Sequence, residues 1–420
     1  MGGAGGHMSH LSEDVDLTFR ELLNILDKIA SGTIEAIEKV DGQNLFVTLD
    51  SNLNLRAARN MSDIKKGGMT AEEYLAKWKD HPAEDAFNHG FKAIGTALNS
   101  LSADKRLSLF RNGSRYVNME IMYPNNPNII RYGGAYVVLH GFKTFDEDGK
   151  VIEDPDAKAA FEELASDVDA ANVLVDEQQW KIHGPQIINL KNIADGESHQ
   201  NVKEQIIREV GENFLDKTLG DYVAKIFRMI ALEEGIQNEQ VIDELIKVLL
   251  QSKDKMKLND IKKLDPDNAQ IIRKYGTKQN AYKTVARILL PIEKIINDFA
   301  IEVLRGIKSF FVADADHDKV VDEIRKELEQ SIDILRSASG NDEKITALLD
   351  KQLEKLGDVS NVASSLEGVV FSYGGKIYKI TGAFAPVNQI IGRARRLPRK
   401  EKIQMKESFL RKLIKRLLFL

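Results

Sequence analysis

The spacing of apolar positions separates helices from strands along this chain. In residues 12–30, apolar side chains recur every three or four positions, at Val15, Phe19, Leu22, Leu26 and Ile29. This spacing places them on one stripe of a helix. The pattern of residues 70–104 also predicts helix.

Alternation typical of strands occurs in several other segments. Residues 44–49 alternate directly after the turn dipeptide Asp41-Gly42, which predicts a half-buried strand. Most of the sequence between about 157 and 357 is helical in pattern. The other strand-like segments are 116–123, 135–140, 180–182, 186–190 and 368–383.

The order of these elements predicts an α+β protein with antiparallel sheets and a large helical insertion. The strands gather in two blocks that are separated by roughly 200 residues of mainly helical pattern. Both blocks are expected to belong to one domain. The expected organisation is a cloning remnant at 1–8, the two parts of the domain at 9–150 and 361–392, the insertion at 151–360, and a basic amphipathic C-terminal helix at 393–420.

Composition excludes several classes of protein. The 420 residues contain no cysteine, so disulfides and thiolate sites are excluded and a cytoplasmic location is expected. No run of 18 apolar residues occurs, so no membrane span is expected. The net charge of −5 hides an asymmetry, because residues 393–416 carry eleven Lys or Arg against two Glu. Such a tail is either a phosphate-binding surface or a solvated helix face.

A lysine beside an acidic turn is the main candidate for chemistry. Residues 37–46 read Ile-Glu-Lys-Val-Asp-Gly-Gln-Asn-Leu-Phe, with Lys39 just before the turn. Residues 367–371 read Glu-Gly-Val-Val-Phe, and Lys376 and Lys379 follow in the next strand. An attacking lysine must be neutral, and burial or nearby cations lower its pKa. The order of these pieces points to nucleotide transfer through a covalent lysine adduct.

These residues resemble the ATP-dependent ligase and capping-enzyme superfamily. Its nucleophile motif is Lys-x-Asp/His-Gly, and residues 39–42, preceded by Glu38, match it. Asn44, two residues after the glycine, is similar to the bacteriophage and kinetoplastid-editing type of RNA ligase, whereas most DNA ligases carry arginine there. The resemblance covers about 34–60, 115–142 and 365–383, under a fifth of the chain.

The resemblance implies a role for each matching residue. Lys39 would carry AMP, Glu367 would organise Mg²⁺ or Mn²⁺, and Lys376 or Lys379 would hold the α-phosphate. Glu120 matches the ribose-binding glutamate of the third motif. The residues expected to contact the nucleotide are Glu38, Asp41, Gly42, Asn44, Arg59 (with Arg56 as the near alternative), Glu120 and Tyr136.

Two departures from the family pattern change the expected site. Asn118-Met119 stands where the family has an aromatic residue and a glycine, so Tyr136 or Phe142 on the next strand is expected to stack on adenine. The two lysines of the fifth motif are three residues apart instead of two. On a regular strand only one of them can face the phosphate, and Lys379 is the preferred candidate.

The resemblance therefore implies an ATP-dependent polynucleotide ligase that joins 5′-phosphate to 3′-hydroxyl ends. RNA is preferred to DNA because of Asn44, and because the 41 residues after Lys379 are too few for the OB-fold that usually follows this core in DNA ligases. One alternative is a DNA ligase or another AMP transferase. A second is a catalytically degenerate ligase fold that serves as a binding or structural module, for example in a phage particle.

Overall fold

The computed structural model describes residues 8–81, 83–128, 130, 132–169, 171–190, 196–307, 310–311, 326, 329–330, 333 and 366–381. Strands in these residues form a small sheet, ordered β1-β12-β11-β2-β10, and a large sheet, ordered β4-β3-β5-β6-β9-β8 with β7 paired to β6. The strands are β1 (Ser9–His10), β2 (Ala36–Lys39), β3 (Gln43–Leu49), β4 (Leu55–Ala58), β5 (Arg115–Met122), β6 (Ala135–Phe145), β7 (Val151–Ile152), β8 (Ala171–Val175), β9 (Gln178–His183), β10 (Ile187–Ile188), β11 (Gly368–Tyr373) and β12 (Lys376–Thr381).

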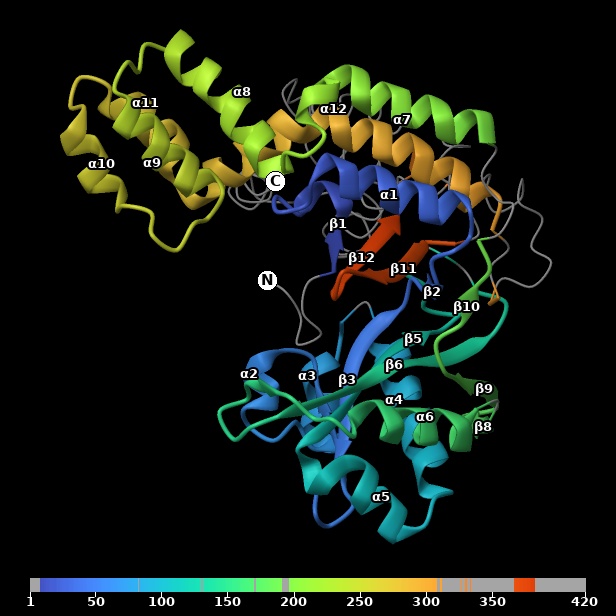
Figure 1. Ribbon diagram of the computed structural model, residues 1–420. Coiled ribbons are helices and arrows are strands. Elements are labelled where there is room, and N and C mark those ends of the chain that lie inside the picture. The colour runs from blue at the N-terminus through green and yellow to red at the C-terminus, as the bar shows by residue number, and fades with distance from the viewer. Residues whose placement is uncertain are drawn as a thin grey trace.

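Helices cover the outer faces of the two sheets (Figure 1). The helices are α1 (Phe19–Ala30), α2 (Met61–Ile64), α3 (Ala71–Trp78), α4 (Glu84–Asn99), α5 (Ala103–Phe110), α6 (Ala157–Val168), α7 (Gly196–Val210), α8 (Leu219–Glu233), α9 (Glu239–Leu249), α10 (Leu258–Leu264), α11 (Ala269–Gly276) and α12 (Lys278–Arg305), with short 3₁₀ turns at Leu11–Glu13, Arg111–Gly113 and Glu212–Phe214.

Two hydrophobic cores follow from this layering. One lies between the large sheet and α3–α6, where Phe87 and Ile94 of α4 pack with Val47 and Val117 of the sheet. The other joins the small sheet to α1, α7 and α12, and it continues into α8–α11. Each fully buried side chain of this kind contributes about 1.5–3 kcal/mol of transfer free energy.

The first helix illustrates how local sequence sets an element's start. The apolar stripe predicts a helix over 12–30, but α1 begins at Phe19 because Thr18 is its N-cap. The Thr18 hydroxyl accepts from the Glu21 N–H, and the Glu21 carboxylate accepts from the Thr18 N–H. This capping box satisfies two backbone donors that have no partner within the helix.

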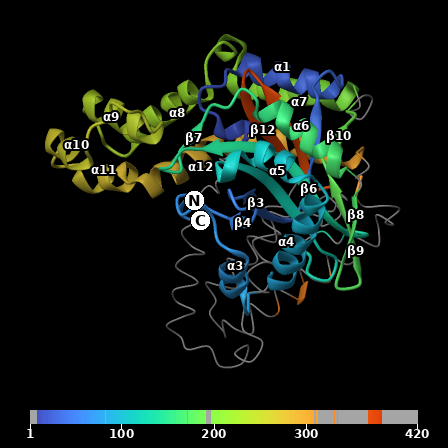
Figure 2. The ribbon, with the colours of Figure 1, turned by 90° about the horizontal axis from the view of Figure 1, so that it is seen from below.

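The expected α+β class agrees with the structure, which mixes helices with sheets rich in antiparallel pairs. The strand-like segments at 180–182 and 186–190 are strands β9 and β10, as predicted. β8 is a further strand that the pattern did not predict, and all three belong to the sheets. Viewed from below, α8–α11 form a lobe beside the two sheets, and α12 connects this lobe to the core (Figure 2). The predicted C-terminal helix lies outside the described residues. No helix in the described part of the chain could span a membrane.

Candidate active site

The candidate site lies where the chain passes from the small sheet to the large sheet. β2 ends at Lys39, and residues 40–42 alone connect it to β3. A Cβ atom on Gly42 would lie 2.7 Å from the carbonyl oxygen of Ile121 and 3.1 Å from Cγ of Glu120. Glycine is therefore required at this position, because it lets the turn pack directly on β5 beside Glu120.

Lys39 and Glu367 form a largely buried ion pair. The Lys39 Nζ lies 2.6 Å from the Glu367 Oε2, and the two side chains are 16% and 14% exposed. Burial alone would lower the pKa of Lys39, but the carboxylates of Glu367 and Glu120 raise it above the ordinary value. Burial raises the pKa of Glu367 to about 7, against the attraction of Lys39. The amine is thus held in its charged form.

Glu120 faces the same lysine from the large sheet. The His140 Nε2 lies 3.2 Å from the Glu120 Oε2. Burial would raise the pKa of Glu120, but the hydrogen bond from His140 and the charge of Lys39 lower it below the ordinary value. Glu120 is therefore an ionised acceptor at neutral pH, oriented by a histidine on the neighbouring strand.

The two lysines of β12 lie on opposite faces of the strand. Lys379 is half-buried, and burial followed by the charge of Lys39 lowers its pKa, so it lies within the field of the Lys39–Glu367 pair. Lys376 instead pairs with Asp14 at 2.8 Å. Side chains alternate between the two faces of a strand, so residues three apart lie on opposite faces. The structure thus brings Lys379 toward Lys39 and directs Lys376 away from it.

Asp41 holds the loop that follows β5. Its Oδ1 accepts from the Asn128 Nδ2 at 2.6 Å, and its Oδ2 accepts from the Ile130 N–H at 2.8 Å. Its own N–H donates to the Tyr132 hydroxyl at 2.6 Å. Both carboxylate oxygens therefore already have donors, so Asp41 supports the turn rather than offering a free contact for a nucleotide.

Aromatic side chains gather beside Glu38. The buried Glu38 carboxylate accepts from the Phe310 N–H at 2.9 Å. The Phe311 ring lies 5.0 Å from the Tyr136 ring and 5.8 Å from the His183 ring, and the Phe310 ring lies 5.5 Å from His183. Tyr136 therefore belongs to an aromatic cluster close to Glu38, the residue before Lys39.

Phe142, the alternative to Tyr136 for adenine stacking, points elsewhere. A register shift near Asn118 interrupts the pairing of β5 with β6. Beyond it, the Phe142 ring packs edge-on against Phe110 of α5 and Phe161 of α6. Phe142 thus belongs to the helix-covered side of the large sheet.

Asn44 is oriented by its neighbours on β5. Its Nδ2 donates to the Asn118 Oδ1 at 2.8 Å and to the Met119 carbonyl oxygen at 3.3 Å, and it stands opposite Glu120 in the register. Its Nδ2 is therefore engaged by β5, whereas its amide oxygen could accept a hydrogen bond from a ligand beside Glu120.

The two candidate arginines differ in their partners. Arg56 pairs with Asp50 at 2.9 Å, which ties the ends of the β3–β4 hairpin together. The Arg59 guanidinium lies 5.0 Å from the Trp78 ring centre and 4.8 Å from that of Phe87, and burial lowers its pKa. Arg56 is thus occupied by a structural pair, whereas Arg59 is held by rings that leave its N–H donors available to an anion.

The carboxylates near Lys39 fit a metal that is shared with a triphosphate. In the described residues, no three His, Asp or Glu side chains are grouped so that they could hold a metal ion. Mg²⁺ commonly binds through one or two carboxylates together with substrate phosphates. Glu367, beside Lys39, offers one such carboxylate.

Several residues at the site were not singled out by sequence reasoning. Phe310 and Phe311 follow α12 in the chain, and nothing local connects them to Glu38. His183 ends β9 just before Gly184-Pro185, and this break in an apolar strand was its only signal.

Comparison with models of known protein families gives no match to this chain, and comparison with curated proteins gives none either. Its function must therefore be inferred from the residues of the site.

Proposed function

We propose that this protein is an ATP-dependent polynucleotide ligase, with RNA as the preferred substrate, and that it acts through a covalent lysyl–AMP intermediate. The observation that carries the proposal is the position of Lys39. Its Nζ lies 2.6 Å from the Glu367 Oε2 at the junction of the two sheets. The charge of Glu120 raises the pKa of Lys39, and the charge of Lys39 contributes to the lowered pKa of Lys379.

Each of these residues has a distinct role in the first step. Lys39 is charged beside Glu367, so its proton must first pass to a carboxylate or to water. The neutral amine then attacks the α-phosphorus of ATP, an N–P bond forms, and the bond to pyrophosphate breaks. Lys379 stabilises charge on the α-phosphate, and Glu120 accepts a hydrogen bond from a ribose hydroxyl. When bound, Mg²⁺ supplies positive charge to the phosphates and to Glu367.

The second and third steps use the same cluster. AMP passes from Lys39 to a polynucleotide 5′-phosphate, and the lysine amine is released. A 3′-hydroxyl then attacks that phosphate and displaces AMP, which seals the strand. Tyr136 is the partly exposed ring of the aromatic cluster beside Glu38, and adenine could stack on it during these steps.

Covalent labelling tests the proposal. The protein is incubated with radiolabelled ATP and Mg²⁺ and separated by denaturing electrophoresis. We expect label on the wild type and on Lys158→Ala, whose side chain is 86% exposed, but none on Lys39→Ala. The phosphoramidate should survive alkali and be lost in acid. No adduct, or an adduct that persists in Lys39→Ala, overturns the assignment.

The acceptor is tested separately. Sealing of 5′-phosphorylated single-stranded RNA is compared with sealing of nicked duplex DNA, using the pre-adenylylated protein. Efficient RNA joining with little DNA sealing supports the RNA preference. The opposite result would instead favour the DNA ligase alternative.

A further inference from the structure

The first half of α12 carries an exposed stripe that combines cations with an aromatic ring. Lys278, Tyr282, Ala286, Leu290 and Lys294 follow one another at intervals of four, and all are exposed. Residues four apart are neighbours on a helix surface, so these five form one continuous stripe. The stripe winds around α12, because each interval of four turns by about 40° beyond a full circle. Tyr282 and Leu290 are 57% and 53% exposed, which is unusual for two large side chains on one helix face.

The charge of this stretch is opposite to that of the whole protein. Residues 278–294 contain the cations Lys278, Lys283, Arg287 and Lys294 against one acid, Glu293, while the chain as a whole carries −5. In the described part of the chain, Lys278 and Lys294 form no ion pair. Their charges are therefore available to an anionic partner.

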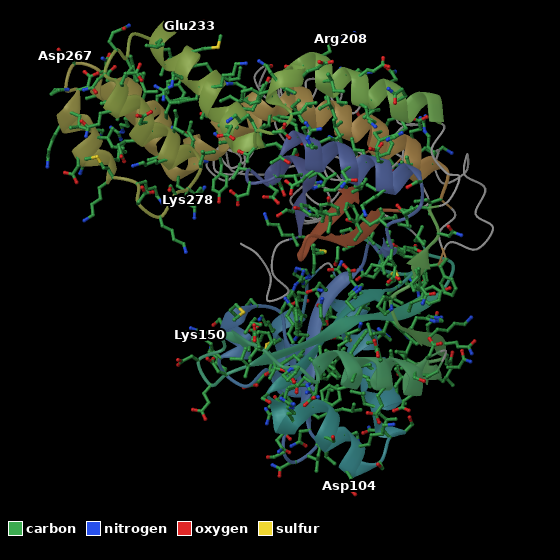
Figure 3. All side chains as sticks on the ribbon, in the orientation of Figure 1. Asp104, Lys150, Arg208, Glu233, Asp267 and Lys278 are labelled. Atoms are coloured by element: carbon green, nitrogen blue, oxygen red, sulfur yellow. The ribbon has the colours of Figure 1, made fainter. Side chains whose placement is uncertain are left out.

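The lobe adds further cations at the start of α12. Leu258, the first residue of α10, packs on Gly276, the last residue of α11, which brings Lys257 to the same end of the lobe as Lys278. Lys257 is exposed and forms no ion pair within the described residues, although its charge helps to lower the pKa of Asp260. Figure 3 shows Lys278 on the side of the lobe turned toward the large sheet, with Glu233 on the opposite side.

α12 also links this surface to the candidate active site. Its 28 residues span about 42 Å at 1.5 Å per residue, from the lobe to the layer over the small sheet. Shortly after its end, Phe310 donates its N–H to Glu38, next to Lys39. The helix that carries the stripe therefore leads along the chain to the residue next to Lys39.

We propose that the stripe of Lys278, Tyr282, Leu290 and Lys294, together with Lys257, binds single-stranded polynucleotide. The cations contact phosphates, and the Tyr282 ring stacks on a base. Cationic grooves with exposed aromatic rings bind single strands in this way without reading sequence. That the bound strand is the one sealed at Lys39 rests on the proposed function, but the binding itself does not.

Salt-dependent binding of a short 5′-phosphorylated oligoribonucleotide tests the stripe. The triple variant Lys257→Ser, Lys278→Ser, Lys294→Ser should flatten the log–log salt dependence by about 2, at about 0.7 per lost phosphate contact. The matched control Lys66→Ser, Lys150→Ser, Lys158→Ser removes three exposed lysines elsewhere and should keep the wild-type slope. An unchanged slope in the first variant, or an equal change in the control, overturns the proposal.

Tyr282 separates stacking from charge. Tyr282→Ala should weaken binding about 10-fold with no change in salt slope, and Tyr282→Phe should restore it, since stacking contributes about 1–3 kcal/mol per base. If Tyr282→Ala binds RNA with wild-type affinity, stacking on Tyr282 is disproved. If the wild-type protein binds no RNA, the whole proposal is overturned.

Adenylylation of the same variants with ATP alone keeps the two proposals distinguishable. If lysyl–AMP forms normally but the triple variant keeps the wild-type salt slope, only the proposed RNA-binding stripe is disproved. If the wild type forms no lysyl–AMP but the variants change RNA binding as expected, only the ligase assignment is disproved.

Discussion

Two buried ion pairs in this molecule allow a comparison between a pair that supports the fold and the pair that we propose acts in chemistry. In the large-sheet core, Arg115 and Asp154 are each 2% exposed, and the Arg115 Nη2 lies 2.7 Å from the Asp154 Oδ2. Thr144 and Arg111 also contact the Asp154 carboxylate, and Arg115 Nη1 donates to the Leu109 carbonyl. Asp154 therefore has donors on both oxygens.

The Lys39–Glu367 pair has a different balance of charge. One lysine faces Glu367, Glu120 and Asp41, so negative charge is in excess. Burial raises the pKa of Glu367 to about 7, whereas the pKa of Asp154 is lowered. An incompletely neutralised pair of this kind is costly for folding, and it would be relieved by a cation or by a ligand that brings one. Perturbed groups of this type concentrate at functional sites.

The largest expected effect comes from breaking the structural pair. Asp154→Ala should lower the free energy of unfolding by about 3–5 kcal/mol, because it leaves the Arg115 guanidinium buried and unpaired. Urea denaturation measures the change. Asp148→Ala, which loses an exposed contact to Lys150, should cost less than about 1 kcal/mol. A loss below about 1 kcal/mol in Asp154→Ala would show that the pair does not support the fold.

Breaking the site pair should affect chemistry instead of folding. Glu367→Gln and Glu120→Gln should each slow lysyl–AMP formation at least ~100-fold, since each removes a contact to a charged or metal-linked group. Circular dichroism should show that both variants are folded at the assay temperature. Glu72→Gln, on the exposed face of α3, is the matched control. A variant that folds normally and adenylylates at the wild-type rate would disprove the role given to its glutamate.

The two pairs should also depend on pH with opposite signs. The pKa of Glu367 is raised in the fold, so its contribution to stability is present below about 4.5 and is lost as the pH rises to about 7. The pKa of Asp154 is lowered, so its contribution is present above 3.8 and is lost in acid.

Denaturation at two pH values tests these signs. Between about pH 5 and pH 8, Glu367→Gln should gain stability relative to the wild type, because it lacks the titrating carboxyl. The difference between Asp154→Asn and the wild type should stay constant over the same range and shrink only below about pH 4. A constant difference for Glu367→Gln would contradict the raised pKa.

How far the sequence predicts this site depends on how local each feature is. The turn at 40–42 and strand β3 are encoded by adjacent residues, so the Asp-Gly dipeptide and the alternation after it were enough to predict them. The spacing of Lys376 and Lys379 determined that they lie on opposite faces.

Contacts between distant segments could not be read in this way. The bond from Phe310 to Glu38 joins residues 272 positions apart, and no periodicity encodes it. Arg59 matched a spacing in the family pattern, but its rings come from α3 and α4, whose packing depends on the whole large-sheet core. Strand β8 was missed because a short apolar run inside a helical stretch fits either interpretation.

The smallest effect should come from a lysine that resembles the site residues in sequence but not in position. Lys376 is 52% exposed and pairs with Asp14, so Lys376→Ser should cost less than about 1 kcal/mol of stability. Because its side chain points away from Lys39, adenylylation should be unchanged. Lys379→Ser, three residues on, should slow adenylylation while leaving stability near the wild type. Equal effects of the two variants on adenylylation would mean that β12 presents both lysines to the phosphate, and the assignment of opposite faces would have to be abandoned.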